Sequence, residues 1–223
     1  MPQGMWRRLA VSATATVALT GVWTAPARAA ETLRVDRQVV AHQDTPAPAI
    51  TSPGLSTTAG DALLVAFVSS DGPSAGGASG FASVTGGGLD WTMRVRANTR
   101  AGVTEIWQAV APDPLSGVAV TATRAGGSYA GSLVVTAFAG ADTTAGGAVA
   151  SASAASGAPS VSLTATRTGS WVWGAGNDWD SASSRTVGSG QTKVDEFLAS
   201  VGDTFWVQRR ASADSVAGAV TRL

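Results

Sequence analysis

Short apolar runs, separated by glycine-rich or polar segments, recur along the chain from about residue 31 onward. Residues 62–70 (ALLVAFVSS) are almost continuously apolar, which predicts a strand buried on both faces. Residues 32–42 alternate apolar and polar positions, as a half-buried strand does. Leu89, Trp91, Met93 and Val95 alternate on one expected face before an ANTRAG turn and a returning strand, which predicts a hairpin. Further strands are predicted over residues 103–110, 117–124, 131–140, 159–167, 170–176, 191–199 and 203–210.

The fold class follows from these strands and from the glycine-rich turns between them. No segment has the apolar periodicity of a helix of ten or more residues. A proline-rich stretch after His42 favours extended backbone outside a central ladder. The Ala/Ser/Gly stretch over residues 143–157 has room for one short edge strand near residues 148–153. We therefore expect an all-β protein, an antiparallel β-sandwich of jelly-roll type.

The first 29 residues resemble a signal peptide. Arg7 and Arg8 precede an uncharged, mainly apolar stretch over residues 9–25, and Ala27-Arg28-Ala29 has the small-x-small pattern of a cleavage site. The competing interpretation is a membrane anchor, but the apolar stretch is close to the lower length limit for a bilayer span. We expect cleavage, a secreted, extracellular protein with no later membrane span, and one β-sandwich domain over residues 30–223.

Charge and composition exclude several classes of function for the expected mature chain. Loss of three arginines from the fifteen basic residues leaves twelve, against fifteen acidic ones. Such a mildly acidic chain has no basic stripe for nucleic acid and no Lys/Arg cluster for anionic lipid. The absence of cysteine excludes disulfides, thiol catalysis and cysteine-based metal sites.

The segments LLVAFVSSDGP, GGGLDWTMRVRANTRAGVTEIWQA, SGAPSVSLTATRTGSWVWGAGNDWD and DTFWVQ resemble a β-sandwich domain of secreted modular proteins of actinobacteria. The resemblance covers roughly residues 31–210. It implies an extracellular location and a sandwich fold, and it transfers no active site. Such domains usually continue to a further apolar strand after DTFWVQ. Here SVAGAVTRL (residues 215–223) is either a diverged final strand or the end of a chain that lacks its last strand, and we favour the second interpretation.

Enzymatic chemistry has little basis in the sequence. His42 is the only histidine, and no G-x-S-x-G motif accompanies it. One histidine without cysteine cannot form a zinc site. A glycoside hydrolase would need two carboxyl groups across a cleft, and the acids over Asp178 to Asp203 are the candidates. We expect a protein that is not an enzyme, with this hydrolase as an alternative.

The segment WVWGAGNDWD (residues 171–180) contains the best candidate site. Trp171 and Trp173 share one face of a strand, as a platform for sugar rings or as core residues, and the core interpretation is favoured. The following NDWD loop provides Asn177, Asp178, Trp179 and Asp180 as ligand-binding candidates, with Trp179 expected to be exposed.

Three roles remain open for the loop. Asp178 and Asp180 offer oxygen ligands for calcium, but aspartate also closes turns and caps helices. Direct contact with a ligand is the third role. We expect a non-catalytic binding or display module for extracellular polysaccharide or a cell-surface protein, or else a purely structural or adhesive module. No cofactor is implied apart from the calcium ion.

Overall fold

The structure is a computed structural model that describes residues 31–144, 146–157, 160–213 and 220–222. These residues form thirteen strands and no helix. The strands are β1 (Arg34–Ala47), β2 (Ala49–Thr51), β3 (Ala62–Ser70), β4 (Phe81–Thr85), β5 (Thr92–Ala97), β6 (Val103–Ala111), β7 (Thr121–Arg124), β8 (Tyr129–Ala139), β9 (Ser162–Thr164), β10 (Trp173–Asp178), β11 (Gln191–Leu198), β12 (Thr204–Arg210) and β13 (Val220–Arg222).

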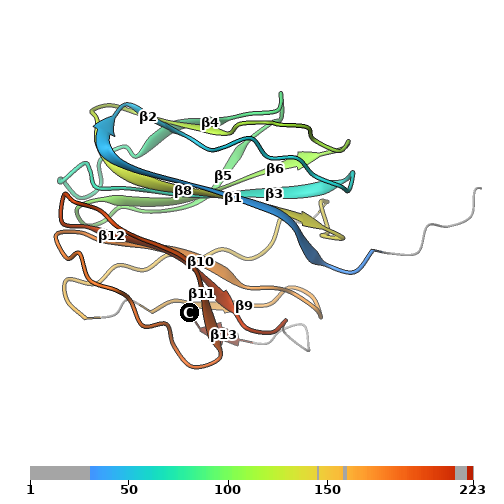
Figure 1. The fold of residues 1–223 in the computed structure, drawn as a ribbon. Helices are drawn as coiled ribbons and strands as arrows, with labels where there is room; N and C mark the ends of the chain where they lie inside the picture. Colours follow the sequence, from blue (N-terminus) through green and yellow to red (C-terminus); the bar gives the residue numbers. More distant parts are fainter. Residues whose placement is uncertain (1–30, 145, 158–159, 214–219, 223) are drawn as a thin grey trace, which may run out of the picture. The chain divides into compact units, whose positions relative to one another are not determined.

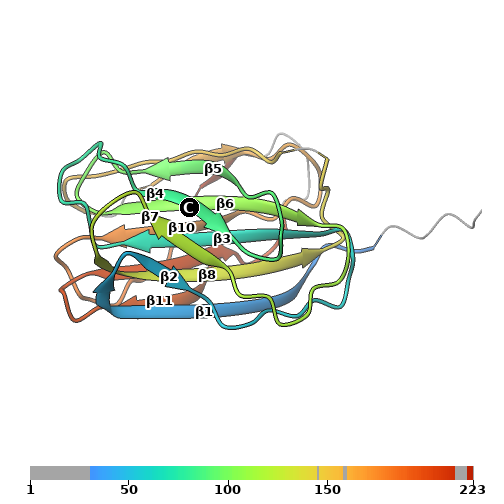
Figure 2. The ribbon, with the colours of Figure 1, turned by 90° about the horizontal axis from the view of Figure 1, so that it is seen from above.

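A five-stranded antiparallel sheet in the order β1-β8-β3-β6-β5 forms the middle layer. Figure 2 shows these strands side by side in that order. The first strand of the chain, β1, forms one edge of this sheet. It pairs with β8, so that Arg34 lies opposite Ala139. Alternate residues of β3 belong to different core clusters, Ala66 to one and Phe67 to the other. The prediction of a strand buried on both faces is therefore confirmed.

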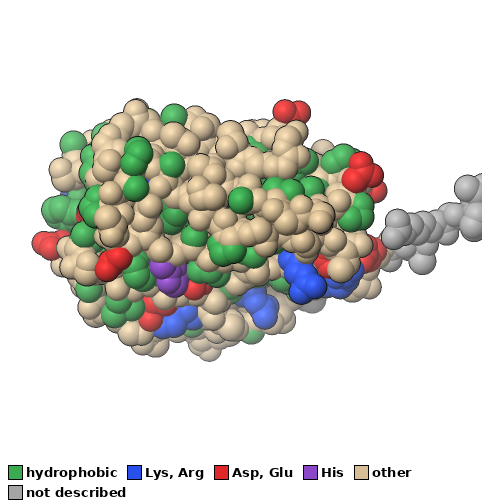
Figure 3. All heavy atoms as spheres, turned by 45° about the horizontal axis from the view of Figure 1, so that its top comes forward, with side chains coloured by type: hydrophobic (Ala, Val, Ile, Leu, Met, Phe, Trp, Pro, Cys, Tyr) green, Lys and Arg blue, Asp and Glu red, His purple; other side chains and the backbone are tan. Residues whose placement is uncertain are grey.

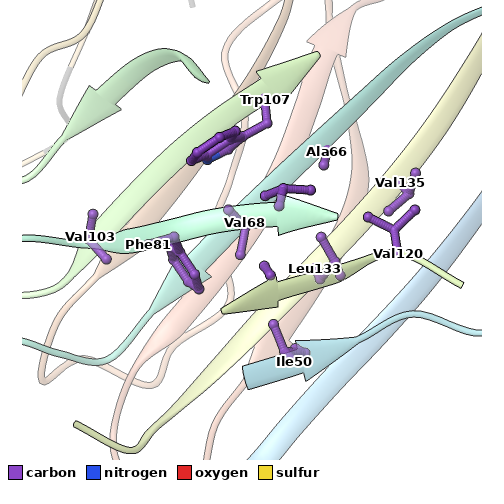
Figure 4. Packing of buried hydrophobic residues seen from close by; sticks show 11 residues of the cluster. Ile50, Ala66, Val68, Phe81, Val103, Trp107, Val120, Leu133 and Val135 are labelled. Carbon is purple, nitrogen blue, oxygen red and sulfur yellow. The ribbon is translucent and has the colours of Figure 1, made fainter. Parts of the chain in front are cut away.

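A second sheet, β2-β7-β4, covers one face of the middle sheet (Figure 1). Its apolar side chains meet those of β3, β6 and β8 in the cluster drawn in Figure 4. Complete burial of a large apolar side chain contributes roughly 1.5–3 kcal/mol, so this cluster anchors the second sheet to the first. The cluster consists of Ile50, Ala66, Val68, Phe81, Val84, Val103, Trp107, Val120, Ala122, Leu133 and Val135.

A third sheet, β10-β12-β11, lies against the opposite face (Figure 1). The rings of Trp173 and Phe67 stack with centroids 5.8 Å apart, and Phe138 meets Trp173 edge-on at 5.1 Å. Trp171 also lies edge-on to Phe138, at 6.4 Å. Both tryptophans thus pack against the middle sheet as core residues, which excludes them from an outward-facing sugar platform.

The antiparallel β-sandwich is confirmed, while the jelly-roll arrangement stays a prediction. Near the end of the chain, Val220–Arg222 forms β13 and pairs with β9, so this part of SVAGAVTRL is a short strand. The strand predicted near residues 148–153 does not form, because small, exposed side chains there bury too little apolar area. The predicted signal peptide lies outside the described residues. Within the described part of the chain there is no helix suited to crossing a membrane.

Candidate binding site

The predicted site loop begins at the end of β10, where neighbouring side chains point to opposite sides of the sheet. Asn177 points inward, and its Nδ2 donates a hydrogen bond to the backbone oxygen of Ser70 at 2.9 Å. Its Oδ1 is buried and has no hydrogen-bond donor within the part of the chain that the structure describes. The next residue, Asp178, forms an ion pair with Arg185. The structure therefore separates these two candidate ligands by the thickness of the sheet.

Trp179 and Asp180 form the turn after β10. The Trp179 side chain is 44% exposed, which confirms the prediction for this residue. Asp180 has a backbone φ of 60°, and its N–H donates to Oδ1 of Asp203 at 2.8 Å. Few residues other than glycine, asparagine and aspartate adopt this left-handed conformation readily. Asp180 therefore serves the turn, whereas Trp179 is available for contact with a partner.

The calcium hypothesis gains no support from this geometry. Asn177 bonds to Ser70 and Asp178 pairs with Arg185, so the predicted oxygen ligands do not converge. Among the described residues, no group of three or more acidic, histidine or cysteine side chains is placed to hold a metal ion. Calcium binding by Asp178 and Asp180 stays a prediction.

Asp203 anchors the turn from the next loop. Its side chain is completely buried, and no donor from the described residues reaches Oδ2. Burial raises the pKa of Asp203 to about 7 and outweighs the hydrogen bond from Asp180, while the negative charges of Asp71 and Asp180 raise it further. A carboxyl group with such a pKa resembles a general acid, but complete burial denies it access to a substrate.

The other acids of the hydrolase alternative are also engaged. Oδ2 of Asp195 lies 2.9 Å from Nε2 of His42, whose ring stacks on Phe197 with centroids 4.5 Å apart. This contact joins β1 to β11, so His42 links two sheets. The single histidine has a structural role that its position in the sequence did not predict.

Glu196 accepts hydrogen bonds from Ser184 and from the Arg185 N–H, and it pairs with Lys193 at 2.8 Å. Burial raises the pKa of Glu196, but these three partners outweigh it and hold the pKa below its usual value. A carboxyl group held in its ionised form is a poor proton donor. Its contacts instead tie the segment after the Asp180 turn to β11.

The surface of β10-β12-β11 that points away from the middle sheet is a second candidate, which we call the outer face. Phe205 and Val207 of β12 are buried, 1% and 4% exposed, and belong to core clusters. Side chains alternate along a strand, so Trp206 and Gln208 lie on the outer face. The outer face also includes Gly174, Gly176 and Asp178 of β10 and Gln191, Lys193 and Glu196 of β11.

Trp206 lies at the centre of the outer face, paired with Gly176 on one side and Glu196 on the other. A Cβ atom at Gly176 would come within 2.2 Å of the indole, so the ring rests on the glycine backbone. The indole N–H donates to Oε1 of Gln208 at 3.0 Å, and Nε2 of Gln208 donates to Gln191 at 2.8 Å. The result is a half-buried aromatic ring fixed in orientation beside two amide side chains.

No family model, curated protein or solved structure matches the chain. Figure 3 shows one face of the molecule on which acidic and basic side chains are interspersed and form no stripe of one sign. Trp206 lies in the strand predicted over residues 203–210, but the sequence did not mark it as a site residue. The pairing of Trp206 with Gly176 identifies the site, and this pairing is known only from the arrangement of the strands.

Proposed function

We propose that this protein is a secreted, non-catalytic module that binds extracellular polysaccharide through the outer face, with Trp179 at its edge. The observation that carries the proposal is the Trp206 indole resting on Gly176. A sugar ring presents C–H groups on its faces and hydroxyl groups around its rim. An indole held in one orientation can pack against the C–H groups, and the neighbouring amides and charged groups can form hydrogen bonds with the hydroxyl groups.

The surroundings of Trp206 support the same interpretation. Gln208 and Gln191 offer both donors and acceptors, and the Asp178–Arg185 pair lies beside the exposed Trp179. Because the side chains are already held by one another, little conformational entropy is lost when a ligand binds. The proposal retains Asp178 and Trp179 from the sequence prediction, adds Trp206 and the two glutamines, and assigns Asn177 and Asp180 to support of the loop.

A binding assay on insoluble polysaccharides, with a glycan array to identify the sugar, tests the proposal. We expect the full chain to bind at least one polysaccharide and Trp206→Ala to lose roughly 30-fold in affinity, about 2 kcal/mol, as central aromatic contacts do. Trp179→Ala measures the contribution of the turn. Met93→Ala, at a residue that is 39% exposed on β5 of the middle sheet, is the matched control and should bind like the wild type.

Two outcomes would contradict the proposal. Absence of binding to every glycan would leave the structural or adhesive module as the better hypothesis. Loss of binding in Trp179→Ala but not in a folded Trp206→Ala variant would restrict the site to the turn that the sequence predicted.

A further inference from the structure

A cavity of about 180 Å³ lies between the middle sheet and the segment around β10, on the inner side of the third sheet. Its lining is mainly apolar and includes four aromatic rings, with Phe67 and Phe138 contributed by the middle sheet and Trp171 and Trp173 by the β10 segment. We call it the aromatic cavity after these rings. The cavity is separate from the outer face, because Trp173 points inward while Gly174 and Gly176 point outward. It therefore requires its own explanation.

Arg94 of β5 provides a positive charge in the wall of this cavity. Its guanidinium donates to Oε1 of Gln108 at 3.0 Å and to the backbone oxygen of Gly147 at 3.2 Å. Any side chain at Gly146 would approach the guanidinium to 2.4 Å, so the backbone confines Arg94 from that side too. The guanidinium is thus held in place by neutral groups.

No Asp or Glu in the described part of the chain forms an ion pair with Arg94. A second guanidinium, that of Arg209, lies over the Trp171 and Trp173 rings, 5.7 and 5.9 Å from their centroids, and it too has no acidic partner there. Half-buried cations usually have an anionic partner, because an apolar wall solvates charge poorly. Two such cations beside one aromatic cavity favour an anion.

The neighbouring acids do not neutralise the positive charges of Arg94 and Arg209. Asp90 and Asp142 line an adjoining cavity of about 200 Å³, which Arg94 and Gln108 separate from the aromatic one. Asp142 is paired with Arg167 at 2.5 Å, and Asp90 is exposed to solvent. Among the described residues, no acid lines the aromatic cavity.

We propose that the aromatic cavity binds a small aromatic carboxylate, one ring bearing one carboxyl group, with its ring among Phe67, Phe138, Trp171 and Trp173 and its carboxylate on Arg94. Size agrees with this ligand class, since a dry cavity of roughly 150 Å³ accommodates one benzene molecule. Charge agrees as well, since a guanidinium binds a carboxylate through two parallel hydrogen bonds. The four aromatic rings in the lining then favour a flat ring over an aliphatic acid.

The test is a titration of the full chain with benzoate, followed by the indole N–H signals of Trp171 and Trp173 in ¹H–¹⁵N NMR spectra. Benzyl alcohol is the matched neutral probe of similar size. We expect benzoate to shift both signals saturably and to bind at least about tenfold more tightly than benzyl alcohol, because a charged hydrogen bond is made only by the acid.

Two arginine variants test whether Arg94 is the cation that binds the carboxylate. Arg94→Gln should abolish the preference for benzoate over benzyl alcohol, whereas Arg100→Gln, the same charge change at an exposed turn residue, should retain it. Equal binding of the two probes to the wild type, no saturable shift, or an unchanged preference in a folded Arg94→Gln variant would each overturn the proposal. The comparison of probes on the wild type decides the matter even if Arg94→Gln does not fold, and polysaccharide binding has no bearing on it.

Discussion

Replacement of Asp203 by asparagine should stabilise the protein at alkaline pH. In the folded protein the pKa of this buried carboxyl group is about 7, against an ordinary value of 3.8. The folded state therefore holds the proton more tightly, so the contribution of Asp203 to stability is greatest below pH 4 and is lost as the pH rises through 7. A difference of about three pKa units corresponds to a cost of up to roughly 4 kcal/mol above pH 7.

The geometry explains why asparagine fits. Its Oδ1 can still accept the hydrogen bond that Asp180 donates at 2.8 Å, and its Nδ2 fills the place of Oδ2, which has no donor in the wild type. An amide donor can also bond to the Asp71 carboxylate, which repels an ionised Asp203. Asp203→Asn thus removes the charge and adds a donor without altering the shape of the side chain.

Urea unfolding at pH 4, 6 and 8 measures the effect. The free energy of unfolding of Asp203→Asn should match that of the wild type at pH 4 and exceed it by up to about 4 kcal/mol at pH 8. Asp113→Asn, at an exposed acid, is the control and should show no pH-dependent difference. A variant less stable than the wild type at pH 8, or a difference that is the same at all three pH values, would refute the reasoning.

Three further predictions concern other parts of the molecule. Glu105 is fully buried and accepts hydrogen bonds from Nε of Arg96 at 2.6 Å and from Nε1 of Trp107 at 2.7 Å. Glu105→Ala should therefore lower the free energy of unfolding, measured in urea, by about 3–5 kcal/mol. A loss below about 1 kcal/mol would contradict this prediction. Asp180→Ala should lower the free energy of unfolding by about 1–2 kcal/mol, because residue 180 has a φ of 60°. Asp180→Gly should melt near the wild-type temperature, and equal melting temperatures of the two variants would argue against strain in the turn. If calcium binds at Asp178 and Asp180, a chelator should lower the melting temperature of the wild type but not that of Asp180→Ala. An unchanged melting temperature in the wild type would rule out a structural calcium ion there.

Local patterns in the sequence predicted most of the strands, because side-chain alternation and apolar runs are properties of neighbouring residues. Residues 62–70 and β3 coincide, and the strand predicted over residues 103–110 is β6 with one more residue. The alternation expected after Leu89 was wrong in part. The strand begins only at Thr92, and a bulge shifts its register between Met93 and Val95, which leaves Met93 39% exposed.

Features that depend on distant pairing were not accessible from the sequence. The three-layer arrangement requires β7 to lie between β2 and β4, and no local pattern specifies that choice. Asn177 and Asp178 appeared as one cluster of ligands, yet the pleat turns them to opposite sides. The pKa of Asp203 is raised first by burial and further by Asp71, which belongs to the loop after β3 and lies far away along the chain.

The pairing of β1 with β8 determines the order in which the protein can fold. During synthesis β1 emerges first, but its partner strand follows only after β3 and β6. Until then β1 has no partner strand in its sheet, and closing so long a loop slows the search for the native pairing. A hairpin of neighbouring strands, β5 with β6, can form early, whereas the β1 edge is completed late. The exposed β1 strand is consequently the part of the nascent chain most in need of protection from aggregation.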